Sequence, residues 1–387
     1  MGGTWSSSTA MNGIAIWLTW VPSSEIVPAV HSLTKSGLRK ELREGAGRVS
    51  ADMRGIVPTC HSCSVAGLVE SVPNFSEGRR LEVVEHLAAA VESVPGAHLL
   101  DRTSDASHNR SVLTIAGEVD AVSEAVERAV AVAVNEIDME THSGEHPRIG
   151  AVDVIPFVPL AGTTIDDCIE LARTFGRRIA ERFDLPVYLY ARAATRAERV
   201  KLSDVRRGQY EGLKREIANP GREPDFGPSQ MHPSAGAVAV GARPFLIAWN
   251  INLSTSDRDL AVRIARRIRE SGGGLPAVQA NGFLIEELRR AQVSMNLLDF
   301  SVTPMWLVWD TVRDVAADDG IELAESELIG LAPLAAFLDV ADHAGAPADA
   351  PVEKRLAAAA RYLKLRDFSS LQALELRLDA ARSGRVR

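Results

Sequence analysis

The hydrophobic pattern of the chain becomes regular at Gly67, where short apolar runs begin to alternate with longer amphipathic stretches. Short apolar runs predict strands, and apolar residues that recur every three or four positions predict helices. In the first half of the chain the predicted strands are 68–72, 98–101, 111–117, 151–156 and 187–190. The predicted helices between them are 82–94, 120–137 and 164–184, with Thr163 or Thr164 as the N-cap of the last.

The second half repeats this alternation after an interruption at 219–236, where four prolines and three glycines break the periodicity. Strands are predicted at 245–253, 278–285, 292–299 and 327–331, and helices at 257–270, 304–317 and 334–341. The pattern therefore predicts an α+β fold with two βαββαβ-type subdomains, each a sheet with helices on one face. We place the subdomains at 67–244 and 245–341. A linker and a charged helical tail at 342–387 would follow, as an appended hairpin or an oligomer contact.

Residues 1–66 differ from the rest of the chain in both charge and pattern. They carry six basic and four acidic residues, whereas the whole chain has a net charge of −8. Ala15–Val21 is largely apolar, but no basic residue precedes it, which argues against a secretory signal. Cys60 and Cys63 have the spacing of half a zinc site, but the sequence has no second cysteine pair to complete it. We expect a disordered extension or an over-extended gene start, with Val65 as a candidate start site.

Composition and charge narrow the range of partners. Of 387 residues, 46% are hydrophobic and 24% are charged, as in ordinary globular proteins. The acidic net charge argues against general binding to nucleic acid or to anionic membranes, which needs a basic surface. No apolar run reaches the ~18 residues of a membrane span. Three cysteines cannot build a disulfide framework, so a reducing, cytoplasmic location is expected.

The first polar motif is VPNFSEGR, which lies between the first predicted strand and the first predicted helix. Interpreted locally, Ser76 is the N-cap of that helix and Arg79 is exposed. Asn74 and Glu77 then belong to the turn. This interpretation needs no ligand.

The second motif is DASHNRS at 105–111, which leads into a predicted strand. It is either a polar connection between strands or a place where Asn109 and Arg110 donate hydrogen bonds to a ligand. The second interpretation has a chemical basis, because a guanidinium holds a carboxylate through two parallel hydrogen bonds.

The densest group of ionisable residues is HSGEHPRIGAVD, which begins at His142 and ends in a buried strand. His142, Glu145 and His146 match the H-x-x-E-H pattern of an inverted zinc hydrolase. That pattern requires a helix, and Gly144 and Pro147 disfavour a continuous helix here. We expect instead a loop at a sheet edge that presents one histidine as an acid or base, since imidazole titrates near neutral pH.

The segment DFGPSQMHPSAG at 225–236 is either an interdomain linker or a functional loop. Few charges follow its first residue, and its glycines allow close approach of a flat ligand. Because clefts between domains are favoured ligand sites, we interpret it as a binding loop.

These motifs occur together, and in this order, in one known family. VPNFSEGR, the Asn-Arg pair, GEHPRIGAVDVIPFVP, VYLY, DFGPS and NLLDF resemble the formiminotransferase family from about Leu68 to about Leu338. That family includes glutamate formimidoyltransferases and the transferase part of formiminotransferase–cyclodeaminase. The resemblance implies two α+β subdomains with a ligand groove between them, usually in a homodimer. The chain ends too early to hold the helical cyclodeaminase domain, so that second activity is expected to be absent.

The family reaction moves a formimino group between N-formimidoyl-L-glutamate and tetrahydrofolate, giving 5-formimidoyltetrahydrofolate and L-glutamate in histidine degradation. By resemblance the catalytic histidine falls on His146, as a general base. We expect tetrahydrofolate as co-substrate, no metal, and no nucleic-acid or membrane partner. Asn74, Asn109, Arg110 and Arg148 are candidate substrate-binding residues, the arginines for carboxylates. The folate-binding stretch falls on Gly227, Pro228, Ser229, Gln230, Met231, His232, Pro233, Ser234, Ala235 and Gly236.

The sequence departs from the pattern of the animal members at two positions. Ala235 stands where a tryptophan is often found, which would loosen packing on the pteridine ring. Thr103 stands where an acid is often found, and Asp105 is a candidate substitute. Two other functions stay open, a folate-binding protein without catalysis and a metal-dependent formimidoylglutamate hydrolase. The sequence also leaves open whether the donor group is formimino or formyl.

Overall fold

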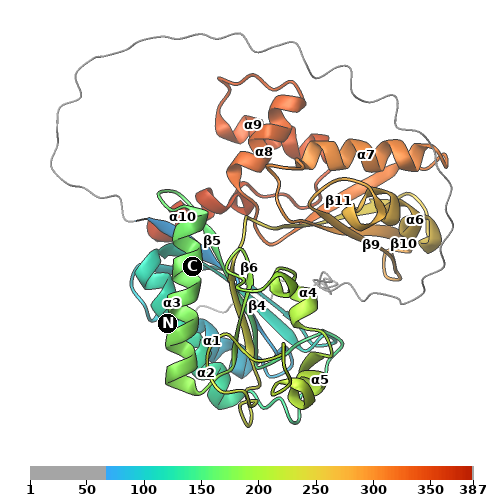
Figure 1. Ribbon diagram of the computed structural model, residues 1–387. Coiled ribbons are helices and arrows are strands. Elements are labelled where there is room, and N and C mark those ends of the chain that lie inside the picture. The colour runs from blue at the N-terminus through green and yellow to red at the C-terminus, as the bar shows by residue number, and fades with distance from the viewer. Residues whose placement is uncertain (1–66, 386–387) are drawn as a thin grey trace, which may run out of the picture. The chain divides into compact units, whose positions relative to one another are not determined.

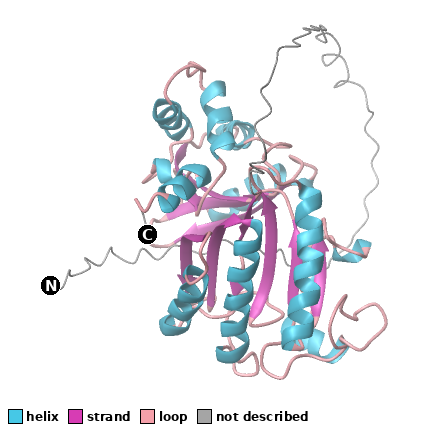
Figure 2. Ribbon diagram, turned by 90° about the vertical axis from the view of Figure 1, so that its left-hand side faces the viewer, coloured by secondary structure: helices cyan, strands magenta, loops and turns pink. Residues whose placement is uncertain are grey.

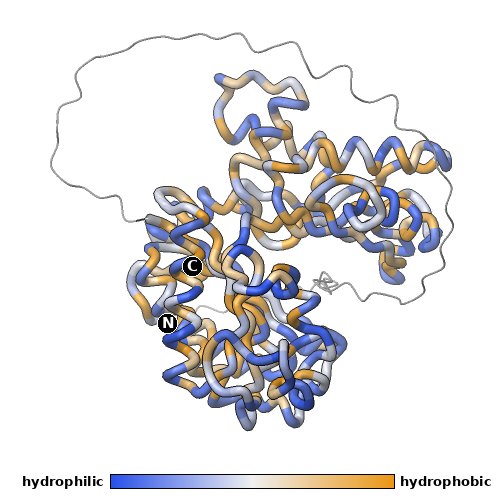
Figure 3. Tube along the Cα trace, viewed as in Figure 1, coloured by the Kyte–Doolittle hydropathy of each residue, from blue (hydrophilic) through white to orange (hydrophobic). Residues whose placement is uncertain are grey.

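The computed structural model describes residues 67–385. The expectations for residues 1–66, including the start at Val65 and the pair Cys60 and Cys63, lie outside the described residues. Over 67–385 the chain forms two β-sheets with helices packed on them, so the predicted α+β fold with two subdomains is confirmed. In Figure 3 apolar and polar residues alternate along the helices, as expected for helices that bury one face.

The larger sheet contains the first βαββαβ unit and two added strands (Figure 1). Its strands are β1 (Leu68–Ser71), β2 (Asn74–Phe75), β3 (Ala97–Asp105), β4 (Arg110–Glu118), β5 (Val152–Pro159), β6 (Val187–Ala191) and β7 (Val238–Ala242). They lie in the order β3-β4-β1-β5-β7-β6, and β2 continues β1 between β4 and β5. β5, β7 and β6 run parallel, and the other pairs are antiparallel. Pro73 lies at the break between β1 and β2, because proline has no N–H to donate to a neighbouring strand.

Helices cover one face of the larger sheet (Figure 2). They are α1 (Leu81–Glu92), α2 (Val119–Glu136) and α3 (Ile165–Phe183). Of the two predicted N-caps of α3, Thr164 is the one used. Its hydroxyl accepts from the Asp167 N–H, and the Asp167 carboxylate accepts from the Thr164 N–H. This reciprocal pair satisfies two N–H groups that the first turn leaves free.

The smaller sheet has the same topology as the first unit. Its strands β8 (Ile247–Leu253), β9 (Val278–Ile285), β10 (Arg290–Leu297) and β11 (Leu323–Ile329) lie in the antiparallel order β11-β8-β10-β9. Its helices are α6 (Arg258–Ile268), α7 (Met305–Ala317) and α8 (Leu334–His343). Numbered within each unit, both sheets therefore run 2-3-1-4, which confirms the prediction of a βαββαβ-type unit in each half.

Several elements were not predicted. They are β2, β7, and, between β6 and β7, the short helices α4 (Leu202–Val205) and α5 (Gln209–Glu216) with the 3₁₀ turn Ala197–Arg199. β7 consists of small buried residues directly after the Pro/Gly segment, so it shows no alternation. β11 begins at Leu323, four residues before the predicted start. No helix over 67–385 is both long and apolar enough to cross a bilayer.

The residues after α8 form α9 (Val352–Tyr362), the 3₁₀ turn Ser370–Gln372 and α10 (Leu374–Arg382). Leu356, Leu363 and Leu374 are buried in the core of the smaller sheet. The Arg377 Nε donates to the Leu100 carbonyl of β3 at 3.0 Å, so α10 also contacts the larger sheet. These helices are packed parts of the fold, while the boundary placed at residue 341 stays a prediction.

Leu374→Ala tests how much the C-terminal helices contribute to stability. Leu374 is fully buried, so removing its side chain loses apolar burial and leaves a cavity. We expect the free energy of unfolding to fall by about 3 kcal/mol in urea denaturation. Leu81→Ala is the control, because Leu81 is 60% exposed. Equal effects in the two variants would show that α10 does not contribute to the core.

Candidate functional site

Three of the predicted motifs meet at the start of β4. Asn109 lies between the other two, because its Oδ1 accepts from the Gly78 N–H and its Nδ2 donates to the Ser143 carbonyl, both at 3.0 Å. Its φ of 48° is the left-handed conformation, which asparagine tolerates better than most residues. The structure therefore brings VPNFSEGR, DASHNRS and the His142 segment together around one amide.

Two glycines allow these loops to approach so closely. A Cβ on Gly78 would lie 2.3 Å from the Asp105 carbonyl oxygen, and one on Gly144 would lie 2.4 Å from that of His108. Any side chain at either position would push the loops apart. The segment around Gly144 is irregular, as predicted, and not helical.

The start of α1 differs from the prediction. Ser76 is not the N-cap, because its hydroxyl donates to the Gly150 carbonyl at 2.7 Å and so ties the loop to the segment before β5. The N-cap is Arg80, which makes no side-chain capping bond, and Glu77 accepts from the N–H groups of Arg79 and Arg80 at 2.9 Å just before the helix. The local interpretation was wrong because a tertiary partner competes for the serine. Arg79 is exposed, as predicted.

His146 is buried, with 4% of its surface exposed, and its Nε2 has no hydrogen-bond partner among the described residues. Burial lowers the pKa of His146 well below its usual value, and the nearby cations Arg110, Arg206 and Arg148 lower it further. The imidazole is therefore neutral at neutral pH. A neutral imidazole with a free nitrogen is able to accept a proton from a bound substrate.

Arg110 lies at the start of β4 with 7% of its surface exposed, and its Nη1 has no partner within residues 67–385. Burial, and then repulsion from Arg206, lowers its pKa to about 10, so the guanidinium stays charged at neutral pH. β2 places Asn74 opposite Val112, two residues along from Arg110, so the register puts Asn74 and Arg110 on the same face. The buried Oδ1 of Asn74 also lacks a partner in the described part of the chain.

Arg148 is placed differently from Arg110. Its Nη2 donates to Glu211 Oε1 at 2.7 Å, its Nη1 to Gln209 Oε1 at 3.1 Å, and its Nε to His142 Nδ1 at 3.2 Å. These contacts tie the loop before β5 to α5. The predicted contact of Arg148 with a substrate carboxylate stays a prediction, and Glu211 would compete with that carboxylate.

A buried ion pair supports the His146 loop, and sequence reasoning did not find it. Asp153 on β5 accepts from the Arg206 guanidinium, and its Oδ1 accepts from the Ile149 N–H at 3.0 Å. Asp153 and Arg206 are 1% and 3% exposed. Asp153 belongs to the predicted motif, whereas Arg206 lies in a stretch with no motif, so the sequence gives no signal for the pair.

The stretch 227–236 packs against the same segment. Gly227, Pro228, Ser229 and Gln230 are exposed, while Met231, Ala235 and Gly236 are buried. Gly236 pairs with Gly150, and the Ala235 carbonyl accepts from the Ala151 N–H at 2.8 Å. The Nδ1 of His232 accepts from the N–H of Ala235 at 3.0 Å, which closes a tight turn. The buried end of this stretch therefore lies beside the His146 loop.

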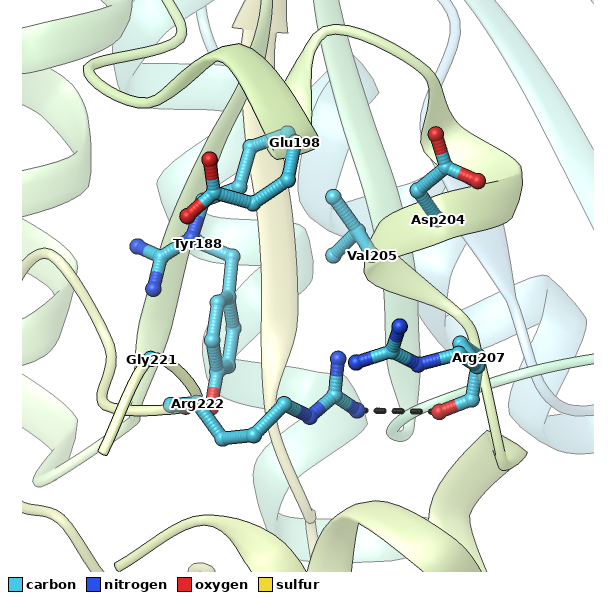
Figure 4. A pocket seen from close by; sticks show the side chains of 8 residues that line it. Tyr188, Glu198, Asp204, Val205, Arg207, Gly221 and Arg222 are labelled. Carbon is cyan, nitrogen blue, oxygen red and sulfur yellow. Dashed lines mark hydrogen bonds between the residues drawn. The ribbon is translucent and has the colours of Figure 1, made fainter. Parts of the chain in front are cut away.

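Among the cavities formed by residues 67–385, two are lined by neither His146 nor Arg110. One of about 280 Å³ lies beside β6 and is lined by Tyr188, Glu198, Arg199, Asp204, Val205, Arg207, Gly221 and Arg222. Figure 4 shows Arg222 donating to the Arg207 carbonyl there. The other, of about 460 Å³, lies between α3 and the exposed start of the 227–236 stretch. No group of His, Cys, Asp and Glu side chains over 67–385 is arranged to hold a metal ion.

Comparison with known proteins decides the family. Residues 68–243 match the family model of the formiminotransferase domain, N-terminal subdomain, and residues 248–369 match that of the formiminotransferase domain. The chain belongs to the formiminotransferase family. The predicted resemblance is thereby confirmed.

Two prokaryotic relatives of this family match over nearly their whole length. Glutamate formimidoyltransferase of Streptococcus pyogenes is 44% identical over 72% of this chain and 93% of its own. That of Thermoplasma acidophilum is 41% identical over 81% of this chain and 98% of its own. Rat formimidoyltransferase-cyclodeaminase is 45% identical, and the match spans only 52% of that protein. Among solved structures, a microcompartment protein from Desulfitobacterium hafniense covers 68% of this chain and 94% of its own at 12% identity, with a TM-score of 0.20.

The two positions that depart from the animal pattern of the formiminotransferase family differ in burial. Ala235 is 2% exposed and lies in the core of the larger sheet, so its side chain faces protein. Thr103 is exposed on β3. Asp105 accepts from the His108 N–H at 2.7 Å, and a substituting role for it stays a prediction.

Asn109→Gly tests whether Asn109 positions loops or binds substrate. Glycine adopts the positive φ freely but removes both amide hydrogen bonds, so we expect a loss of about 2 kcal/mol in the free energy of unfolding. Asn109→Ala should cost about 1 kcal/mol more, because alanine is strained at that φ. Urea denaturation measures both. Wild-type stability combined with a raised KM would instead assign Asn109 to substrate binding.

Proposed function

We propose that this chain is a transferase that moves a formimino group between N-formimidoyl-L-glutamate and tetrahydrofolate, giving 5-formimidoyltetrahydrofolate and L-glutamate. The observation that carries the proposal is a buried neutral imidazole, His146, whose pKa is lowered by the buried guanidinium of Arg110, which has no Nη1 partner among the described residues. Relatives that match over more than nine-tenths of their length are named glutamate formimidoyltransferase, which supports the same reaction. The reaction belongs to histidine degradation.

The geometry supports a general-base mechanism. The folate N5 attacks the formimino carbon, the N5–C bond forms, and the free Nε2 of His146 takes the N5 proton. The C=N electron pair moves onto the formimino nitrogen in the tetrahedral adduct. When the C=N bond re-forms, the bond from carbon to the glutamate nitrogen breaks, and His146 returns the proton to that nitrogen. Holding both substrates in place supplies much of the remaining rate.

The substrates of this reaction are anions, so the buried cations have a clear use. The free Nη1 of Arg110 suits a carboxylate of the glutamate substrate, and the Oδ1 of Asn74 is an acceptor on the same face. The stretch 227–236 is the proposed folate contact, because its buried end adjoins the His146 loop. A groove between the subdomains, a homodimer, a cytoplasmic location and independence from metal are parts of the proposal that follow from the family resemblance.

An assay with purified protein tests this function. Formimidoylglutamate should disappear only when tetrahydrofolate is present, and chelators should have no effect. Consumption without folate that chelators abolish would instead indicate a metal-dependent hydrolase. Folate binding without turnover would indicate a binding protein. Supplying N-formyl-L-glutamate in parallel identifies the donor group.

A further inference from the structure

His146 lies in a positive environment assembled from several segments. The groups that act most strongly on it are Arg110 of β4, Arg206 after α4, His108 in the turn before β4, and Arg148 in its own loop. Three of the four are guanidinium cations, and the fourth, His108, has its Nδ1 3.0 Å from Asp105 Oδ1. The protonation of His146 would therefore place a further positive charge among them, in a site where water does not screen it.

Two of these arginines already have carboxylate partners, and Arg110 differs from them. Asp153 pairs with Arg206, and Glu211 pairs with Arg148 at 2.7 Å. The carboxylates of Asp153 and Asp105 act to raise the pKa of Arg110, but the Arg110 Nη1 has no hydrogen-bond partner among the described residues. Its charge is the one that a bound anion would most directly offset.

We propose that binding of the glutamate substrate enables His146 to act as the base. A substrate carboxylate held by Arg110 supplies the negative charge that lets His146 accept a proton, so the empty site does not take up that proton and the occupied site does. This inference rests on the proposed function, because it assumes that an anionic substrate binds at Arg110. It adds that binding of one substrate sets the proton affinity of the base.

The same coupling gives the reaction an order. Proton uptake by His146 is favourable only while the glutamate moiety is in place, so the proton stays within the site until the leaving nitrogen takes it. Departure of L-glutamate then restores the positive environment and leaves the imidazole neutral for the next cycle. A base that protonates in the absence of substrate would not be neutral, and so not ready to accept a proton, when the substrates bind.

NMR titration of the full chain with labelled histidines tests the coupling, with L-glutamate as the probe. The His146 signal is assigned by its loss in His146→Ala. We expect saturating glutamate to raise the midpoint of the His146 titration by at least about one pH unit, a tenfold gain in proton affinity. The same concentration of sodium chloride should not do so. Glutamate that binds by calorimetry and leaves the midpoint unchanged, or glutamate that does not bind, overturns the proposal.

Variants locate the effect at Arg110. Arg110→Gln should abolish the glutamate-induced shift, and Arg110→Lys should keep part of it because the charge remains. Arg128→Gln is the matched control, since Arg128 is exposed on α2 and pairs with Glu124. The wild-type titration needs no variant, so the test stands even if Arg110→Gln does not fold. If glutamate shifts the His146 midpoint but the protein transfers no formimino group, the proposed reaction is refuted and the coupling stands. If the protein transfers the group and the midpoint does not shift, the reaction stands and the coupling is refuted.

Discussion

Replacing His146 with alanine is expected to lower the rate of formimino transfer by at least about 100-fold. The attacking folate nitrogen must lose a proton as it bonds to carbon, and Nε2 of His146 is a buried, unpartnered acceptor in the described site. Without it the proton has to leave to a poorly placed water. Tetrahydrofolate binding should stay close to wild type, because the proposed folate stretch uses other residues.

The measurement compares kcat with the dissociation constant for tetrahydrofolate in the same preparation. His86→Ala is the control histidine, since His86 lies exposed on α1, where its Nδ1 is 2.9 Å from Glu136 Oε2. The two variants should differ in kcat and agree in folate affinity. A turnover in His146→Ala close to that of the control would remove His146 from the base role and leave the transfer itself to be explained by another residue.

Sequence patterns predicted those elements of the fold whose signal is local. The α3 helix was predicted with Thr163 or Thr164 as its N-cap, and the structure uses Thr164, which bonds to Asp167 three residues further on. β9 was predicted to the residue, over Val278–Ile285. β7 and α5 were missed because a short run of small buried residues and a two-turn helix carry too little periodicity to recognise. Their positions depend on the neighbouring strands and loops.

The candidate site shows the same contrast between features with a local sequence signal and features that depend on distant residues. His146 was assigned by family resemblance and Arg110 from its motif, and both roles stay predictions. Nothing local shows that Asn109 joins these motifs or that Ser76 bonds to Gly150. Those contacts span tens of residues and arise only when the loops meet. The Ser76 prediction was wrong for this reason, since a good capping residue by type had a better partner in the folded chain. The Asp153–Arg206 pair was missed for the same reason.

Asp153→Ala is expected to be the most destabilising substitution at the site, lowering the free energy of unfolding by about 3–5 kcal/mol. It removes the buried carboxylate that pairs with the Arg206 guanidinium, and it removes the acceptor of the Ile149 N–H. Asp153→Asn should cost less, because the amide oxygen keeps the bond to Ile149. Glu170→Ala, which breaks an exposed ion pair with Arg173, is the control and should change stability by less than about 1 kcal/mol.

A double-mutant cycle separates the charge interaction between Asp153 and Arg206 from the packing of their side chains. Asp153→Leu combined with Arg206→Met removes both charges, so no unpaired ion remains and the double variant should be more stable than Asp153→Leu alone. Transfer activity should still fall in the double variant, because the Ile149 N–H is no longer held and the His146 loop can shift. If instead Asp153→Ala costs less than about 1 kcal/mol, water must reach Arg206 and the pair does not fix the loop. Recovered stability without recovered activity would assign the buried pair to positioning the base.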